Sequence, residues 1–130
     1  MTRALRAWTP ALVWAATIFV LSSFPGSAYP ATNLVNADKL VHIALYAPLG
    51  ALCARGLVRG TGLGMGAILG LAALLSTLYG VSDELHQAFV PGRNSDWRDV
   101  VADALGSLIG AALITWLAAR RRRRSVGAVR

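Results

Sequence analysis

Four long apolar stretches, separated by short polar ones, make up most of the 130-residue chain. Each is long enough to cross the hydrocarbon core of a bilayer as a helix, which takes about 20 residues. The pattern therefore predicts an all-α membrane protein, a bundle of four transmembrane helices. The stretches run over Ala7–Phe24, Asp38–Leu57 and Leu63–Phe89, and from Ser95 or Asp96 past Trp116.

The composition agrees with this class. The chain is 55% hydrophobic and only 15% charged, which leaves too few charges to cover a soluble domain of this size. A net charge of +7 could suggest nucleic acid as a partner, but the basic residues lie at the ends of apolar stretches and not along one polar face. We therefore expect the lipid bilayer, and no nucleic acid, as partner. The single cysteine, Cys53, lies inside an apolar stretch, so we expect it to be a small buried residue.

The distribution of Lys and Arg predicts how the chain is oriented. Ten of the thirteen basic residues fall on one side of the predicted spans, and Lys39, Arg93 and Arg98 fall on the other. Because cytoplasmic loops are rich in Lys and Arg, we expect both termini in the cytoplasm. Residues 1–119 would form the membrane domain, and residues 120–130 a basic cytoplasmic tail. An alternative for the first stretch is a cleaved signal peptide with Gly26-Ser27-Ala28 as its cleavage site.

With this orientation, every acidic residue and both histidines lie at the extracytoplasmic ends of the helices. Polar side chains recur at helical spacing in the second, third and fourth stretches, so each helix should carry them on one face. Ionisable residues inside a membrane are costly, which makes such a cluster a functional-site candidate. We expect one outward-opening pocket lined by Asp38, Lys39, His42, Tyr46, Glu84, Gln87, Arg93, Asp99 and Asp103.

Two pairings within this cluster are expected from depth and sequence distance. Pro91-Gly92 turns the chain between Glu84 and Arg93, which should bring these two side chains near enough to form an ion pair. His42 should face Asp99 or Asp103.

Small residues predict where helices touch. Gly62, Gly66 and Gly70 recur at every fourth position of the third stretch, and Gly106 and Gly110 do so in the fourth. Such stripes allow two helix backbones to approach closely, so we expect both stripes at helix–helix contacts.

Several of these residues stand in motifs that resemble the VanZ-like family of small bacterial membrane proteins. The motifs are Ser22–Gly26, Asp38–His42 with Tyr46 after it, Glu84–Arg93 and Asp99–Gly106. The resemblance implies a multi-pass protein of the bacterial cytoplasmic membrane and cell envelope. The member that names the family is linked to resistance to the glycopeptide teicoplanin. Many members carry Asn where this chain has Asp103, which here adds a charge.

The motifs leave two functions open. In the first, the pocket binds a lipid head group, a phosphate or an antibiotic-related ligand, for example an anionic lipid or a lipid-linked envelope precursor. Arg93 and Lys39 would suit the phosphate. In the second, the protein is a membrane-embedded acid/base or metal-assisted enzyme acting on a lipid-linked phosphate or glycan. Its catalytic residues would come from His42, His86, Glu84 and Asp103.

A metal variant of the enzyme would use His42, His86, Asp99 and Asp103 as mixed ligands. The spacing contains no paired-histidine motif, so the sequence assigns no metal ligands and defines no cofactor. A third interpretation is purely structural: the polar residues form an ion-pair network that sets the register of the helices.

Overall fold

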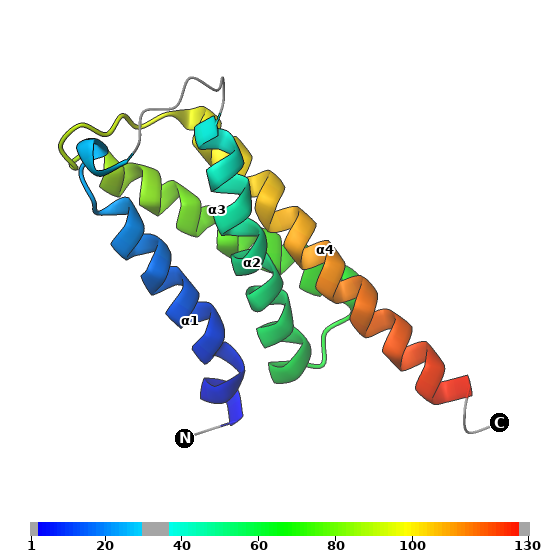
Figure 1. Ribbon diagram of the computed structural model, residues 1–130. Helices are drawn as coiled ribbons and strands as arrows, with labels where there is room; N and C mark the ends of the chain where they lie inside the picture. Colours follow the sequence, from blue (N-terminus) through cyan, green and yellow to red (C-terminus); the bar gives the residue numbers. More distant parts are fainter. Residues whose placement is uncertain (1–2, 30–36, 128–130) are drawn as a thin grey trace.

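The computed structural model describes residues 3–29 and 37–127 and contains four α-helices in this part of the chain (Figure 1). They are α1 (Arg3–Ser22), α2 (Ala37–Gly60), α3 (Met65–Gln87) and α4 (Trp97–Gly127), with a short 3-10 turn, η1 (Gly26–Ala28), after α1. All four are long and apolar enough to cross a membrane, and the described residues form no strand. The predicted fold class is confirmed.

The helix ends differ from the predicted ones by a few residues. α1 ends at Ser22, since Pro25 follows closely, and α2 continues to Gly60. α4 remains helical through Arg120–Arg124. The predicted outer loop falls partly on residues 30–36, which, like Arg130 of the predicted tail, lie outside the described residues.

Helix α2 lies at the centre of the bundle and contacts each of the other three helices. Helix α1 lies at the edge of the bundle, against α2 and α3. Two hydrogen bonds donated by aromatic side chains hold it there, one to α2 and one from α3. The indole Nε1 of Trp14 donates to the carbonyl of Leu45 at 2.8 Å, and the hydroxyl of Tyr79 donates to the carbonyl of Ala15 at 2.6 Å.

The closest helix contact joins α2 to α4 through glycine. A Cβ added at Gly106 would lie 2.6 Å from the carbonyl oxygen of Ile43, and one added at Gly110 would overlap the carbonyl oxygen of Ala47. In the opposite direction, Gly50 of α2 faces the backbone of Ser107. The predicted contact role of Gly106 and Gly110 is confirmed.

The same prediction is wrong for Gly62, Gly66 and Gly70. No atom of another element lies within 4 Å of a Cβ added at any of them, and all three are exposed. Small residues permit a close contact but do not attract a partner, so packing elsewhere decides which face of the helix is used. Helix α3 turns a different stripe inward, formed by Ile68, Ala72, Ser76, Gly80, Asp83, Glu84 and Gln87.

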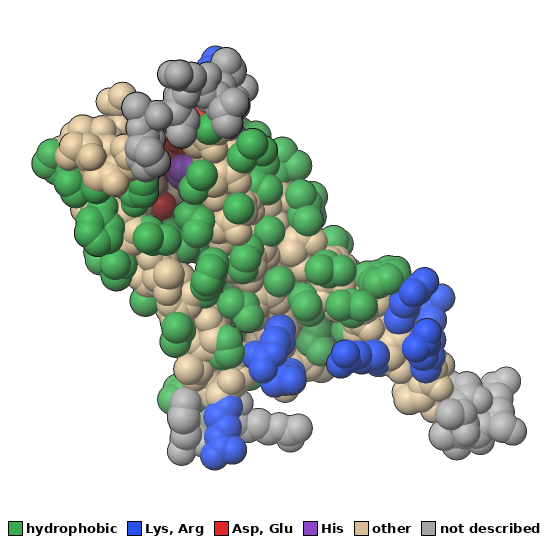
Figure 2. Space-filling model, in the orientation of Figure 1, with side chains coloured by type: hydrophobic (Ala, Val, Ile, Leu, Met, Phe, Trp, Pro, Cys, Tyr) green, Lys and Arg blue, Asp and Glu red, His purple; other side chains and the backbone are tan. Residues whose placement is uncertain are grey.

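Charge is divided between the two ends of the bundle. Figure 2 shows Lys and Arg side chains gathered mostly at the end where the chain termini lie. At the other end, acidic and histidine atoms are visible in a hollow between apolar side chains. This is the end at which α1 and α3 finish and α2 and α4 begin.

We predict that Gly106→Leu destabilises the bundle, because the added side chain must push α4 away from α2. The expected loss is about 1–3 kcal/mol of unfolding free energy, measured as a lower Tm in detergent. Gly70→Leu is the matched control, because Gly70 faces open space. Equal Tm values for Gly106→Leu and wild type would contradict this contact.

Candidate functional site

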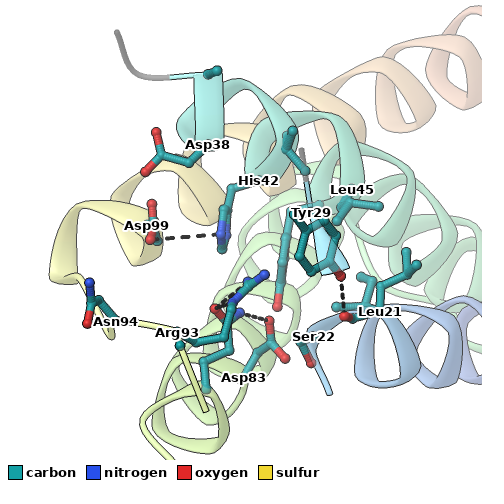
Figure 3. Close-up of a pocket in the computed structure, with 16 residues that line it drawn as sticks. Leu21, Ser22, Tyr29, Asp38, His42, Leu45, Asp83, Arg93, Asn94 and Asp99 are labelled. Atoms are coloured by element: carbon teal, nitrogen blue, oxygen red, sulfur yellow. Dashed lines mark hydrogen bonds and ion pairs between the residues drawn. The ribbon is translucent and has the colours of Figure 1, made fainter. Parts of the chain in front are cut away.

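A cavity of about 490 Å³ opens at the end of the bundle where the acidic residues gather (Figure 3). Helices α1 and α2 give it an apolar wall that includes Ile18, Leu21, Val41 and Leu45. Its polar side is formed by Asp38, His42, Asp83, Gln87, Arg93, Asn94 and Asp99. The cavity is therefore amphipathic, with hydrocarbon and charged surfaces facing the same space.

His42 occupies the centre of the polar side, on the second turn of α2. Its Nδ1 lies 2.8 Å from Oδ1 of Asp103, which is fully buried two turns into α4. When this carboxylate is ionised it can only accept a hydrogen bond, and Nδ1 is then the donor. The other ring nitrogen, Nε2, then points towards Oδ2 of Asp99 at 3.9 Å and Oε1 of Glu84 at 4.0 Å. The prediction that His42 faces Asp99 or Asp103 is confirmed, and it lies near both.

Asp103 is held against His42 from behind by α3. A Cβ added at Gly80 would lie 2.6 Å from Oδ2 of Asp103, so only a glycine leaves room for this carboxylate. Helix α3 thus approaches closely the side chain that joins α2 to α4.

The predicted ion pair between Glu84 and Arg93 is wrong. Oε2 of Glu84 accepts the backbone N–H of Asp96 at 3.0 Å, immediately before α4 begins. Helix starts have N–H groups without intrahelical partners, and a carboxylate satisfies one of them. Glu84 therefore faces the bundle interior, whereas Arg93 lies on the loop beyond it.

Arg93 is held by an amide and an aromatic ring. Its Nη2 and Nε donate to Oε1 of Gln87 at 2.6 and 3.2 Å, and Nε2 of Gln87 donates to Oδ2 of Asp83 at 3.0 Å. The guanidinium also lies 5.0 Å from the ring centre of Tyr29. Within the described residues no carboxylate forms an ion pair with Arg93, so its positive charge remains available at the cavity.

Two loops lock together to place Arg93. The backbone N–H of Gly26 donates to the carbonyl of Pro91 at 3.0 Å, and a Cβ at Gly26 would overlap the carbonyl of Gly92. Gly92 itself has φ +72°, a left-handed conformation that favours glycine. The Pro-Gly motif after α1 and the Pro-Gly-Arg motif after α3 are thus two sides of one contact.

Lys39 faces carboxylates and does not line the cavity. Its ammonium group lies 2.5–3.0 Å from carboxylate oxygens of Asp38, Asp96 and Asp99. The backbone N–H of Arg98 and the ammonium of Lys39 hold the pKa of Asp96 below its ordinary value. The expectation that Lys39 lines a phosphate pocket is therefore wrong.

The structure divides the nine predicted pocket residues into two groups. Six of them line the cavity: Asp38, His42, Tyr46, Gln87, Arg93 and Asp99. Lys39, Glu84 and Asp103 lie behind this lining and contact it, because interhelical pairing turns them inward. Tyr46 is fully buried, with its ring stacked parallel to that of His42 at 6.4 Å.

His86 does not belong to the cluster. Its Nε2 lies 3.0 Å from the hydroxyl of Ser23, and its ring packs against Phe19 of α1 at 4.7 Å. The expected metal set of His42, His86, Asp99 and Asp103 is therefore not brought together. The structure brings a different group together. His42, Glu84 and Asp99 each offer one ligand atom, and these three atoms lie within 4.8 Å of one another.

Ten of the sixteen residues that line the cavity were missing from the predicted pocket, among them Tyr29, Asp83 and Asn94. Asp83 shares a helical face with Tyr79, which could have indicated it. Tyr29 and Asn94 lie in loops, where no periodicity shows which way a side chain points.

Fold and site together define a multi-pass helical membrane protein with an amphipathic cavity at one end of the bundle. A family model described as VanZ/LLP1 matches residues 7–118, which include all of α2 and α3, most of α1 and α4, and every residue of the site. The chain belongs to the VanZ/LLP1 family. Comparison with curated proteins and with solved structures found no match.

We predict that Gly26→Ala weakens the contact between the two loops, since its methyl group meets backbone atoms that cannot rotate away. The expected cost is about 1–3 kcal/mol, seen as a lower Tm in detergent. Ser27→Ala, at the exposed neighbouring position, is the control and should leave the Tm unchanged. If both variants behave alike, the two loops do not depend on this contact.

Proposed function

We propose that this protein binds the anionic polar head of an envelope lipid, or of a lipid-linked envelope precursor, in the amphipathic cavity. One observation carries the proposal. Arg93 has no carboxylate partner among the described residues, and its guanidinium lies at a cavity that also has an apolar wall. An amphiphile needs these two surfaces side by side.

The apolar wall supports binding from the membrane. Ile18 and Leu21 on α1 and Val41 and Leu45 on α2 line the cavity at the ends of their helices. A lipid chain could lie along these side chains while the head group reaches the polar side.

The charges of the polar side suggest where an anion would bind. Asp38, Asp83 and Asp99 also line the cavity, and they would repel a phosphate. Gln87 stands between Asp83 and Arg93 and leaves part of the guanidinium fork free for a planar contact with a phosphate or carboxylate. We therefore place the anionic group beside Arg93 and Tyr29.

In the proposed orientation, the cavity opens on the extracytoplasmic side of the bacterial cytoplasmic membrane, and α1 is retained as a span. The excess of Lys and Arg at the opposite end supports this orientation. An antibiotic-related ligand and a role in teicoplanin resistance remain expectations from the family resemblance.

Cysteine labelling in intact cells tests the orientation. An impermeant thiol reagent should label Ser27→Cys and should not label Gly60→Cys, because the two positions lie at opposite ends of the bundle. Native Cys53 is buried and provides a low background. Labelling of Gly60→Cys alone would reverse the orientation.

Lipid retention tests the binding proposal. Purified protein in detergent is titrated with short-chain phosphatidylglycerol, and the bound lipid is counted by native mass spectrometry. Loss of a charge-assisted hydrogen bond costs about 1.5–3 kcal/mol, so Arg93→Ala should weaken binding about 10- to 100-fold.

Arg98→Ala is the matched control for this titration. Arg98 is an exposed arginine at the same end of the bundle, and its guanidinium stacks on Trp97 outside the cavity. An equal loss of lipid in both variants would show general surface attraction, and no loss in Arg93→Ala would remove the cavity from lipid binding.

The hydrogen bond between His42 and Asp103 favours a second candidate function, acid–base catalysis on a lipid-linked phosphate or glycan. Asp103 would orient the imidazole and His42 Nε2 would exchange a proton with the substrate. His42 lines the cavity, whereas His86 does not, so His86 is dropped from the proposed catalytic residues.

A further inference from the structure

We propose that His42, Glu84 and Asp99 form a binding site for a divalent metal ion, with Zn²⁺ as the preferred ion. The site would lie on the inner side of the cavity, between α2, α3 and the first turn of α4. The inference does not depend on lipid binding, because the ion would be held by protein side chains alone.

The ligand atoms are close to the arrangement that a metal requires. Nε2 of His42 lies 4.0 Å from Oε1 of Glu84 and 3.9 Å from Oδ2 of Asp99, and the three atoms lie within 4.8 Å of one another. Ligands at about 2.1 Å from a tetrahedral ion are about 3.4 Å apart. Rotations that move each ligand atom by about half an ångström would therefore complete the coordination.

Glu84 supplies an independent indication that something binds here. The residue is only 3% exposed, and its Oε1 has no hydrogen-bond partner although the atom is buried. Its other oxygen is already bound to the backbone N–H of Asp96. A buried oxygen without a partner is costly, and Nε2 of His42 lies 4.0 Å from this one, too far for a hydrogen bond. A cation between the two atoms would satisfy both.

Asp103 occupies the position of an outer-shell residue. A histidine that binds a metal usually donates its other ring N–H to a carboxylate, which fixes the tautomer and the orientation of the ring. Here Nδ1 of His42 lies 2.8 Å from Oδ1 of Asp103. With the proton on Nδ1, the lone pair of Nε2 is directed to the proposed ion.

The charge balance also favours a cation. Glu84, Asp99 and Asp103 are three buried carboxylates around one imidazole. The ammonium of Lys39 contacts Oδ1 of Asp99 and offsets the negative charge of that carboxylate. Asp38 and Asp96 share the same ammonium. Glu84 has no basic partner nearer than the 4.0 Å contact with His42 among the described residues.

The donor set is compatible with Zn²⁺. One imidazole nitrogen and two carboxylate oxygens suit Zn²⁺, which takes three protein ligands and an open fourth position in many reactive sites. His42 and Asp99 also line the cavity, so an open position would face it. A phosphate or carboxylate that enters there could bind both the ion and Arg93.

Metal content tests the proposal without any lipid. The purified protein, stripped with EDTA and dialysed against ZnCl₂ in detergent, should retain about one Zn²⁺ per chain by atomic emission spectrometry. Asp99→Asn and Glu84→Gln should each lower zinc affinity at least 10-fold. Asp103→Asn, which removes an outer-shell contact, should lower it about 10- to 100-fold. Wild-type protein that retains no zinc would overturn the proposal.

A control variant separates this site from general binding to histidines. His86→Gln removes the histidine outside the cluster and should bind zinc as wild type does. Loss of zinc in His86→Gln equal to that in Asp99→Asn would also overturn it. X-ray absorption at the zinc edge of the wild type provides a measurement that requires no variant. One imidazole with oxygen ligands is expected, and sulfur or two imidazoles would contradict the site.

Discussion

A carboxylate buried among helices needs a partner, and this requirement shapes one whole end of the bundle. Asp103 is fully buried and depends on His42, which lies on the neighbouring helix α2. The two helices can bring these side chains within hydrogen-bond distance because Gly106 and Gly110 allow their backbones to touch. The packing of α2 on α4 and the chemistry of the site are therefore one property of the molecule.

The other helices join the site through backbone groups. Glu84 binds α3 to the start of α4 by accepting the N–H of Asp96. The glycine contact between Gly26 and Gly92 ties the loop after α1 to the loop after α3. This contact keeps Arg93 at the cavity, although its guanidinium has no acidic partner among the described residues. The motifs that resemble the VanZ-like family are separate in the sequence but lie together at one end of the bundle.

The predictions were wrong where the spacing of residues in one segment does not show which other segment contacts them. The glycines of the third stretch have the same spacing as those of the fourth, yet Gly66 and Gly70 face open space. Their spacing describes what a face would permit, whereas contact requires a second helix on that side. Glu84 and Arg93 are close in sequence and opposite in charge, yet a helix start offered Glu84 a nearer donor. Neither outcome can be read from spacing in one segment.

The sequence by itself determined the four membrane helices, the division of charge between their ends and the family, because these depend on local composition, length and motif order. It also indicated His42, Arg93 and Asp99 as members of one polar cluster, since helical periodicity and membrane depth restrict where they can lie. The tertiary structure alone decided which of them line the cavity, that His86 stands apart, and that His42, Glu84 and Asp99 converge. The reason is physical: the rotation of each helix about its axis is set by the sum of its packing contacts, and a turn of a few tens of degrees moves a side chain from a site to its outside.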